Sequence, residues 1–192
     1  MFRHLLAGLA VVVALPAVAQ QTYVIDPVHS NPQWEARHIG MSLQRGNFGK
    51  ATGKVVLDPA QKTGSVEVVI DATSIRTFDS RLDAIVKGER FFNVEKFPTI
   101  TFRSTRMTFD GDRPTQVDGE LTMIGVTRPV TLKIDDFHCG EQAFNKKPMC
   151  AADATTTIKR SEFGMKAGVD VGSPADEITI NLPVEAYKEV AG

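Results

Sequence analysis

Apolar and polar residues alternate along most of the chain from Tyr23 onward. Successive side chains of a β-strand point to opposite faces, so this alternation predicts strands with one buried face. Clusters of Gly, Pro, Asp and Asn separate the alternating segments and are typical of turns. Nine segments alternate, at residues 23–26, 33–39, 48–57, 65–71, 99–109, 116–124, 130–137, 152–159 and 178–186. We expect about eight of them to be strands of one sheet.

One segment has a helical period instead. Leu82, Ile85 and Val86 recur at i, i+3 and i+4 within residues 79–87, which predicts an amphipathic helix of about two turns. Ser80 with Asp83 is typical of a capping box. Because so short a helix is not stable alone, we expect it to pack across an open end of the sheet.

A Phe-rich stretch follows the predicted helix. It contains Phe91, Phe92, Phe97 and Phe102, and it passes into the strand predicted to begin at Thr99. Aromatic side chains remove a large apolar area from water. A cluster of them between a helix and a strand therefore either fills a core or lines a cavity, and the function depends on which.

Successive strands joined by short turns predict an antiparallel sheet. Closing this sheet into a barrel would remove its exposed edges. A barrel of eight strands is just wide enough to be filled by side chains or to hold one slender ligand. A two-sheet sandwich is the alternative that the pattern leaves open.

The N-terminus has the pattern of an export signal. A basic start at Arg3 precedes an apolar run that ends at an A-x-A site, Ala17 to Ala19. We interpret residues 1–19 as a cleaved signal peptide and residues 20–192 as one exported domain, with an uncleaved anchor as the alternative. The 22 basic and 23 acidic residues of the chain nearly balance, which gives no indication of nucleic-acid binding.

Two cysteines, Cys139 and Cys150, bracket a polar segment. In an exported protein such a pair predicts a disulfide. Closing a loop of this size would stabilise the fold by about 3 kcal/mol in the chain-entropy model. A metal site that includes His138 is the alternative, but no fourth ligand stands at a standard spacing.

Several motifs along the chain carry a family resemblance. In order, they occupy residues 23–30, 37–40, 45–49, 91–102, 119–130 and 155–165. Together they resemble the YceI family of bacterial periplasmic proteins, which are lipocalin-like and bind polyisoprenoids. The sequence departs from the common pattern of that family at its cysteine pair and at Trp34.

The resemblance implies an all-β fold, an extended antiparallel eight-stranded barrel with one short helix and, here, a disulfide-closed loop. It also implies a periplasmic location and a long isoprenoid lipid as the ligand, in some members an isoprenoid quinone, with no other cofactor and no metal. Transient contact with a membrane or a membrane protein, and a monomer or a homodimer, are both compatible with it.

Inward positions of the strands, the helix and the Phe-rich stretch are the expected lipid-binding residues. They are Trp34, Ala36, His38, Phe48, Val66, Val68, Ile70, Leu82, Ile85, Val86, Phe91, Phe92, Phe102, Leu121, Met123, Ile158, Ile180 and Leu182. Small inward residues at Ala36, Gly119 and Ala154 favour an open lumen. For each position, ordinary core packing is the alternative.

Two histidines are the candidates for catalysis. His38 shares the inner face with Trp34 and could donate to a head group such as a quinone carbonyl, whereas His29 lies in an Asp-Pro turn. Structural roles are the alternative for both. Since no hydrolase, metalloprotease or phosphate-binding motif is present, we expect a binding protein without a catalytic step. An enzyme that uses His29 or His38, and a scaffold or stress protein with a filled barrel, are the competing hypotheses.

Overall fold

The computed structural model describes residues 20–189. The predicted signal peptide, residues 1–19, lies outside this range. Within residues 20–189, none of the helices has the length and apolar character needed to cross a membrane.

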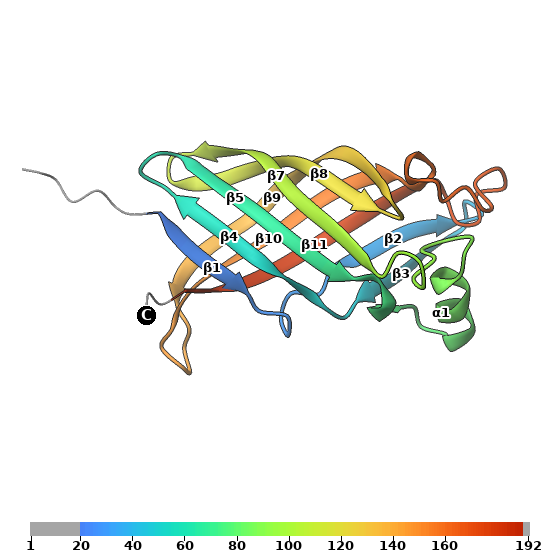
Figure 1. Ribbon diagram of the computed structural model, residues 1–192, viewed down its shortest axis with the longest axis horizontal. Helices are drawn as coiled ribbons and strands as arrows, with labels where there is room; N and C mark the ends of the chain where they lie inside the picture. Colours follow the sequence, from blue (N-terminus) through green and yellow to red (C-terminus); the bar gives the residue numbers. More distant parts are fainter. Residues whose placement is uncertain (1–19, 190–192) are drawn as a thin grey trace, which may run out of the picture.

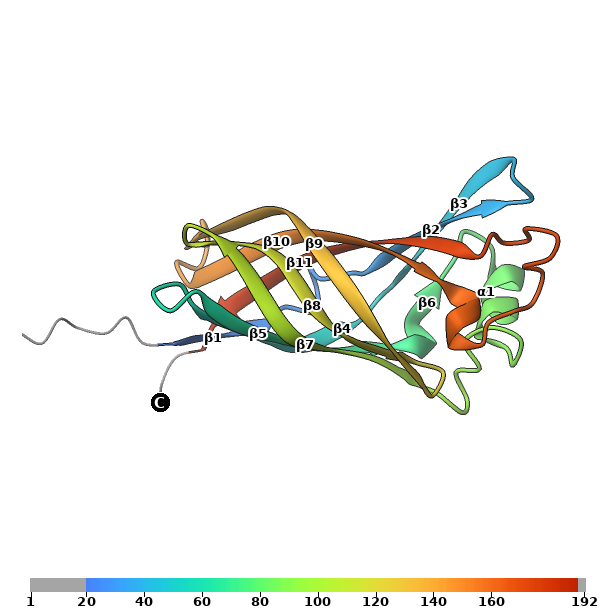
Figure 2. The ribbon, with the colours of Figure 1, turned by 90° about the horizontal axis from the view of Figure 1, so that it is seen from above.

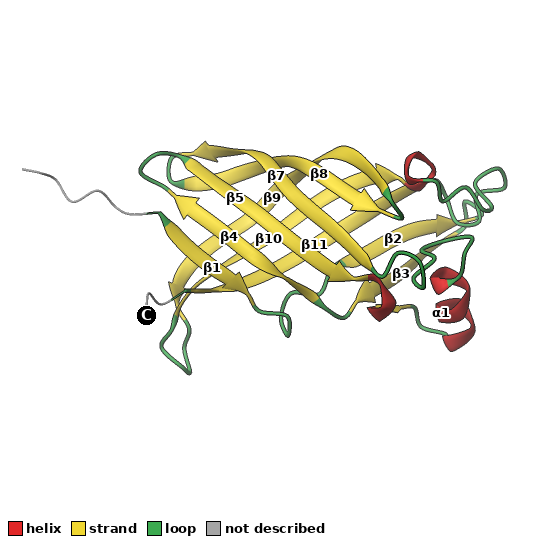
Figure 3. Ribbon diagram, in the orientation of Figure 1, coloured by secondary structure: helices red, strands yellow, loops and turns green. Residues whose placement is uncertain are grey.

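The described chain forms one antiparallel sheet that closes into a barrel (Figure 1, Figure 3). Closure occurs because β1 pairs with β4 on one side and with β11 on the other. The eight strands of this circuit are β1 (Gln21–Ile25), β4 (Ala51–Asp58), β5 (Thr63–Asp71), β7 (Thr99–Asp110), β8 (Arg113–Met123), β9 (Val126–Glu141), β10 (Pro148–Lys159) and β11 (Glu177–Lys188). The predicted barrel is confirmed, and the sandwich alternative is wrong.

Three further strands extend the sheet beyond β11. They are β2 (Gln33–His38), β3 (Ser42–Phe48) and β6 (Ile75–Arg76). The sequence pattern ends one strand at residue 39 and begins the next at residue 48, which is wrong, because β3 already begins at Ser42 and ends at Phe48. The turn is confined to the tip of the β2–β3 hairpin, where Ile39 and Gly40 adopt positive φ angles of 47° and 71°.

One edge of β11 pairs with β10, and its other edge is shared by two strands. Its C-terminal residues pair with β1, and residues 178–181 pair with β2. The loop between β1 and β2 is fixed to β11 at one point, where the buried Ser30 hydroxyl donates to the Glu185 carbonyl and accepts from the Glu185 amide. One long strand therefore holds two short segments that are consecutive in the chain.

The predicted helix is present as α1 (Ser80–Lys87), and two short 3₁₀ helices are η1 (Ala72–Ser74) and η2 (Arg160–Phe163). The N-cap of α1 is Asp79, whose carboxylate accepts from the Arg81 amide. The predicted capping box was wrong, because Asp83 instead accepts from the amide and hydroxyl of Thr77. As expected, α1 lies at one end of the barrel (Figure 1, Figure 2).

The predicted disulfide is confirmed between Cys139 and Cys150. The two residues stand directly opposite each other on β9 and β10, with Cα atoms 4.0 Å apart. The strands continue past them, so the connecting loop is only residues 142–147. This loop lies at the end of the barrel opposite α1 (Figure 1).

Gly53 is required by the close approach of β4 to β5. It has φ of 150°, and a Cβ atom there would collide with the carbonyl of Glu67. We expect Gly53→Ala to lower the free energy of unfolding by about 1–3 kcal/mol, measured by urea denaturation.

Gly140→Ala is the matched control, because Gly140 is also in a strand and nothing lies within 4 Å of the position of its Cβ. We expect it to stay within about 0.5 kcal/mol of the wild type. Equal effects of the two substitutions would contradict this account of β4.

Candidate functional site

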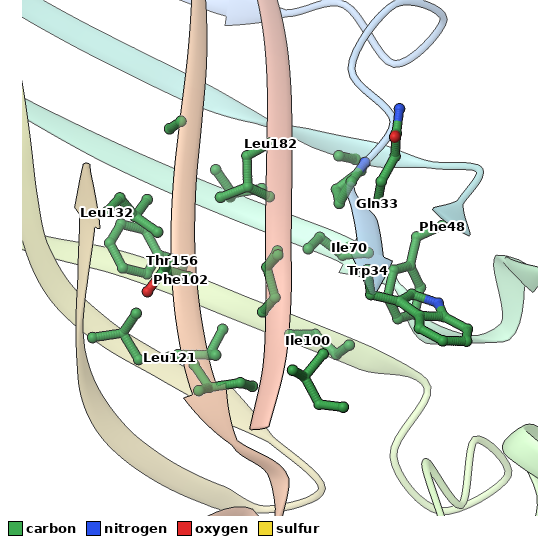
Figure 4. A pocket seen from close by; sticks show the side chains of 18 of the residues that line it. Gln33, Trp34, Phe48, Ile70, Ile100, Phe102, Leu121, Leu132, Thr156 and Leu182 are labelled. Carbon is green, nitrogen blue, oxygen red and sulfur yellow. The ribbon is translucent and has the colours of Figure 1, made fainter. Parts of the chain in front are cut away.

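The interior of the barrel contains an apolar cavity of about 450 Å³. All eight strands of the closed circuit contribute side chains to it, as do β2, β3 and α1. Figure 4 shows the labelled side chains spread along the lumen, from Leu132 and Phe102 to Trp34 and Phe48. The volume falls in the range of sites that enclose one small-molecule ligand.

All eighteen residues expected at the lipid site line this cavity. They are Trp34, Ala36, His38, Phe48, Val66, Val68, Ile70, Leu82, Ile85, Val86, Phe91, Phe92, Phe102, Leu121, Met123, Ile158, Ile180 and Leu182. Their contact with a ligand stays a prediction. The alternation along each strand brings them together, because every second residue of a closed sheet faces the same lumen.

Other lining residues were missed. Leu132, Ile134 and Val184 follow the same alternation and could have been included on that signal. By contrast, Arg160, Ser173 and Pro174 lie in or beside an irregular segment. Because such a segment has no period, no sequence signal places its side chains at the cavity.

The two ends of the cavity differ. At one end the lining includes Leu82 and Ile85 of α1, which are 46% and 53% exposed. At the other end it includes Leu57, Met107 and Val117, which are all buried. The cavity is therefore closed by side chains at one end and bordered by exposed apolar residues at the α1 end, which we call the mouth.

The Phe-rich stretch both fills part of the core and lines the cavity. Phe92 packs edge-on against Phe48 near the mouth, with ring centroids 5.5 Å apart. Phe102 is buried inside the barrel, and its ring occupies the space beside Gly119. Gly119 thus makes room for a ring and not for the lumen, whereas Ala36 and Ala154 do line the cavity.

Trp34 lies on the cavity wall opposite Gly46 of β3. The indole ring covers Gly46, where any Cβ atom would collide with it. Its Nε1 is buried and has no hydrogen-bond partner among residues 20–189. Leaving such a donor unpaired costs about 1–3 kcal/mol, and because the atom is buried it does not open onto the lumen.

Arg160 is a buried cation on the cavity wall, only 2% exposed. Its guanidinium donates to four backbone carbonyls, those of Met165, Ala167, Pro174 and Ala175, at 2.6–3.0 Å. Burial lowers its pKa from the usual value. The side chain therefore holds together the loop that follows η2, residues 164–176, beside the mouth.

The two candidate histidines lie in different places. His38 lines the cavity, while the carboxylate of Glu35 turns away to Arg45 at 2.7 Å, as expected for opposite faces of β2. His29 lies outside the cavity, with Nδ1 2.7 Å from the carboxylate of Asp26.

The hydrogen bond between His29 and Asp26 affects both groups. It raises the pKa of His29 and lowers the pKa of Asp26. Together with Glu185, these residues form the group of three among residues 20–189 whose donor atoms lie close enough to hold a metal ion.

Comparison with known proteins shows which family has this architecture. The YceI-like domain profile matches residues 23–186. The chain belongs to the YceI family. The resemblance seen in the motifs is therefore confirmed, and the match covers nearly all of the described barrel.

Two curated relatives of this YceI protein cover almost its whole length. A UPF0312 protein from Shewanella denitrificans is 31% identical over 98% of this chain and 100% of the relative. A UPF0312 protein from Pseudomonas aeruginosa is 30% identical over the same shares.

Solved structures agree in fold. Burkholderia cenocepacia BcnA superposes with a TM-score of 0.72 at 26% identity, over 84% of this chain and 99% of BcnA. A polyisoprenoid binding domain from Saccharophagus degradans has a TM-score of 0.62 over 87% of this chain and 98% of that domain. At 14% identity, the latter shows the fold alone.

Removing the Arg160 guanidinium should destabilise the YceI barrel. Arg160→Leu would leave four carbonyls without their donor, so we expect a loss of about 3 kcal/mol in the free energy of unfolding. Arg103→Leu is the control, because Arg103 is 75% exposed and only 3.6 Å from Glu67. Urea denaturation of both variants checks this, and similar losses would contradict the role assigned to Arg160.

Proposed function

We propose that this YceI protein binds a long-chain polyisoprenoid lipid inside its barrel and carries or stores it in the periplasm. The observation on which this depends is the cavity itself. It runs through a closed barrel, its wall is almost entirely aliphatic and aromatic, and it reaches an apolar mouth.

A polyprenyl chain is chemically suited to such a wall. It has no hydrogen-bonding groups, so its site needs a dry apolar tube and no paired polar residues. Burial contributes about 0.8 kcal/mol per methylene before the costs of ordering are subtracted. Even a chain of moderate length is therefore expected to bind tightly and to leave slowly.

The ligand class gains support from a structural neighbour. The Saccharophagus degradans domain of the same fold is described as polyisoprenoid binding. An isoprenoid quinone is the form that we favour, because β2 places His38 on the cavity wall. Its imidazole could donate to a quinone carbonyl.

We propose no catalytic step. His38 and Arg160 are the ionisable side chains on the described cavity wall, and the donors of Arg160 are directed to backbone carbonyls. The acid–base pair formed by Asp26 and His29 lies outside the cavity. General acid–base catalysis on an enclosed lipid would need a group within hydrogen-bond reach of it, which leaves His38 as the residue for the enzyme hypothesis.

The mouth has the features of a membrane-contact surface. The β2–β3 hairpin, α1 and the loop after η2 lie at this end of the barrel (Figure 2). Their exposed apolar side chains are Ile39 and Met41 of the hairpin, Phe78, Leu82 and Ile85 in and before α1, and Val171 of the loop. The hairpin is bonded to the loop that carries Val171, through the Ile39 amide and the Gly172 carbonyl. A rim of this kind would let a lipid pass between bilayer and cavity without crossing water.

Filling the lumen should remove the lipid. Ala154 is buried on the cavity wall, so we expect Ala154→Phe, purified under native conditions, to carry several-fold less extractable isoprenoid than the wild type, measured by mass spectrometry. Thr157→Phe adds the same ring three residues later at an exposed position and should retain the lipid. Wild-type protein that contains no lipid and takes up no added prenyl quinone would refute the proposed function.

Lipid exchange with membranes should depend on the mouth. Phe78 is 91% exposed at the α1 end, and Phe144 is 93% exposed in the loop at the opposite end. We expect Phe78→Ser to slow transfer of a prenyl quinone from neutral phosphatidylcholine vesicles about tenfold, and Phe144→Ser to leave the rate unchanged. Equal rates for the two variants would show that the mouth does not contact the bilayer.

A further inference from the structure

A second hollow, of about 160 Å³, lies on the outer wall of the barrel. Its lining has a different chemistry from that of the apolar cavity. The polar residues around it are two histidines and three carboxylates: His29, His138, Asp136, Asp153 and Glu185. The function proposed above does not use any of them.

The register of the sheet brings these residues together. His138 of β9 stands opposite Ala151 of β10, which stands opposite Glu185 of β11. In the adjacent row, Asp136 stands opposite Asp153. Side chains alternate along each strand, so these residues point outward while their neighbours Phe137 and Val184 line the cavity.

The hollow forms because the residue at its centre, Ala151, has a small side chain. Ala151 lies between two longer side chains, His138 and Glu185, and contributes only a methyl group. The disulfide forms the next cross-strand pair, Cys139 with Cys150, and therefore fixes β9 against β10 beside the hollow. The position of His138 relative to β11 is thus built into the fold.

The loop between β1 and β2 supplies the remaining donors. His29 Nδ1 lies 2.7 Å from Asp26 Oδ2 and 3.9 Å from Glu185 Oε2. All three donor atoms lie within 4.8 Å of one another. Ligand atoms bound to one tetrahedral zinc ion at about 2.0–2.1 Å are separated by roughly 3.4 Å, so small side-chain movements would bring these three into a coordination shell.

Charge at this position is not balanced by basic residues. Within the described chain, the carboxylates of Asp26 and Glu185 form ion pairs with His29 and with no Lys or Arg. Asp136 does have such a partner, Arg113 at 3.0 Å. Two carboxylates beside an imidazole, without a competing cation, form a donor set that favours a metal ion.

We propose that this outer hollow binds a divalent transition metal of the zinc class. Asp26, His29 and Glu185 are its ligands. His138 stands across Ala151 on the far side of the hollow, with its Nε2 3.0 Å from the Asp136 carboxylate. Imidazole with carboxylate is a donor set suited to zinc. Calcium and magnesium favour shells built almost entirely of oxygen, so they should bind more weakly here.

Such an ion would act on the same loop that reaches the cavity. Ser30 follows His29 directly, is bonded to Glu185 and lines the apolar cavity. A metal held by Asp26, His29 and Glu185 would therefore fix this loop against β11 from the outside. Because the ligands come together only in the folded chain, binding must also stabilise the fold.

The test titrates ZnCl₂ into the metal-free, disulfide-intact protein and measures the heat of binding and the melting temperature. We expect one zinc ion per chain and a higher melting temperature, with CaCl₂ giving a much smaller shift. His29→Ala and Glu185→Gln should each weaken zinc binding by at least about tenfold, and His138→Ala by less. Wild-type protein that binds no zinc would overturn the proposal.

Glu67→Gln is the matched control for Glu185→Gln, because Glu67 is an exposed carboxylate on another part of the outer wall. It should bind zinc as the wild type does. Binding that survives both His29→Ala and Glu185→Gln would show an adventitious ion and would also overturn the proposal. Lipid content is measured separately in each variant, so a failure here does not bear on the apolar cavity.

Discussion

Closure of the sheet at β1 is the constraint on which the rest of this structure depends. By pairing with both β4 and β11, this short strand removes the edges of the eight-stranded circuit. Once the circuit is closed, every second side chain faces one common lumen. The apolar face that an open sheet would bury against another layer instead becomes the wall of a cavity of about 450 Å³.

The lumen remains open because the facing side chains are mostly aliphatic and of moderate size, with Ala36 and Ala154 among them. Aromatic rings are placed against glycines on the wall: Trp34 covers Gly46, and Phe102 occupies the space beside Gly119. Polar chemistry is kept at the ends and on the outside. Arg160 uses its charge to hold backbone carbonyls beside the mouth, and the imidazole and carboxylate cluster faces outward.

This division gives the barrel two different ends and two different faces. The α1 end presents exposed apolar side chains around the cavity, whereas the opposite end is closed by buried residues and carries the disulfide hairpin. The same alternation that places Val184 on the cavity wall places Glu185 on the outer wall. A lipid site and a metal site can therefore share β11 without competing for the same side chains.

The sequence by itself determined most of the barrel strands, the position of the helix at an open end, the disulfide and the inner face of the barrel. It did so because a period of two specifies the face of each residue locally, as for Val66, Val68 and Ile70. Only the tertiary structure decided that the interior is a cavity, because the distance across a lumen depends on all of the strands together. The tertiary structure also decided the contacts of irregular segments, such as those of Arg160 with the 164–176 loop. It brought His29 beside Glu185, which lies 156 positions further along the chain, through long-range strand pairing that no local pattern encodes.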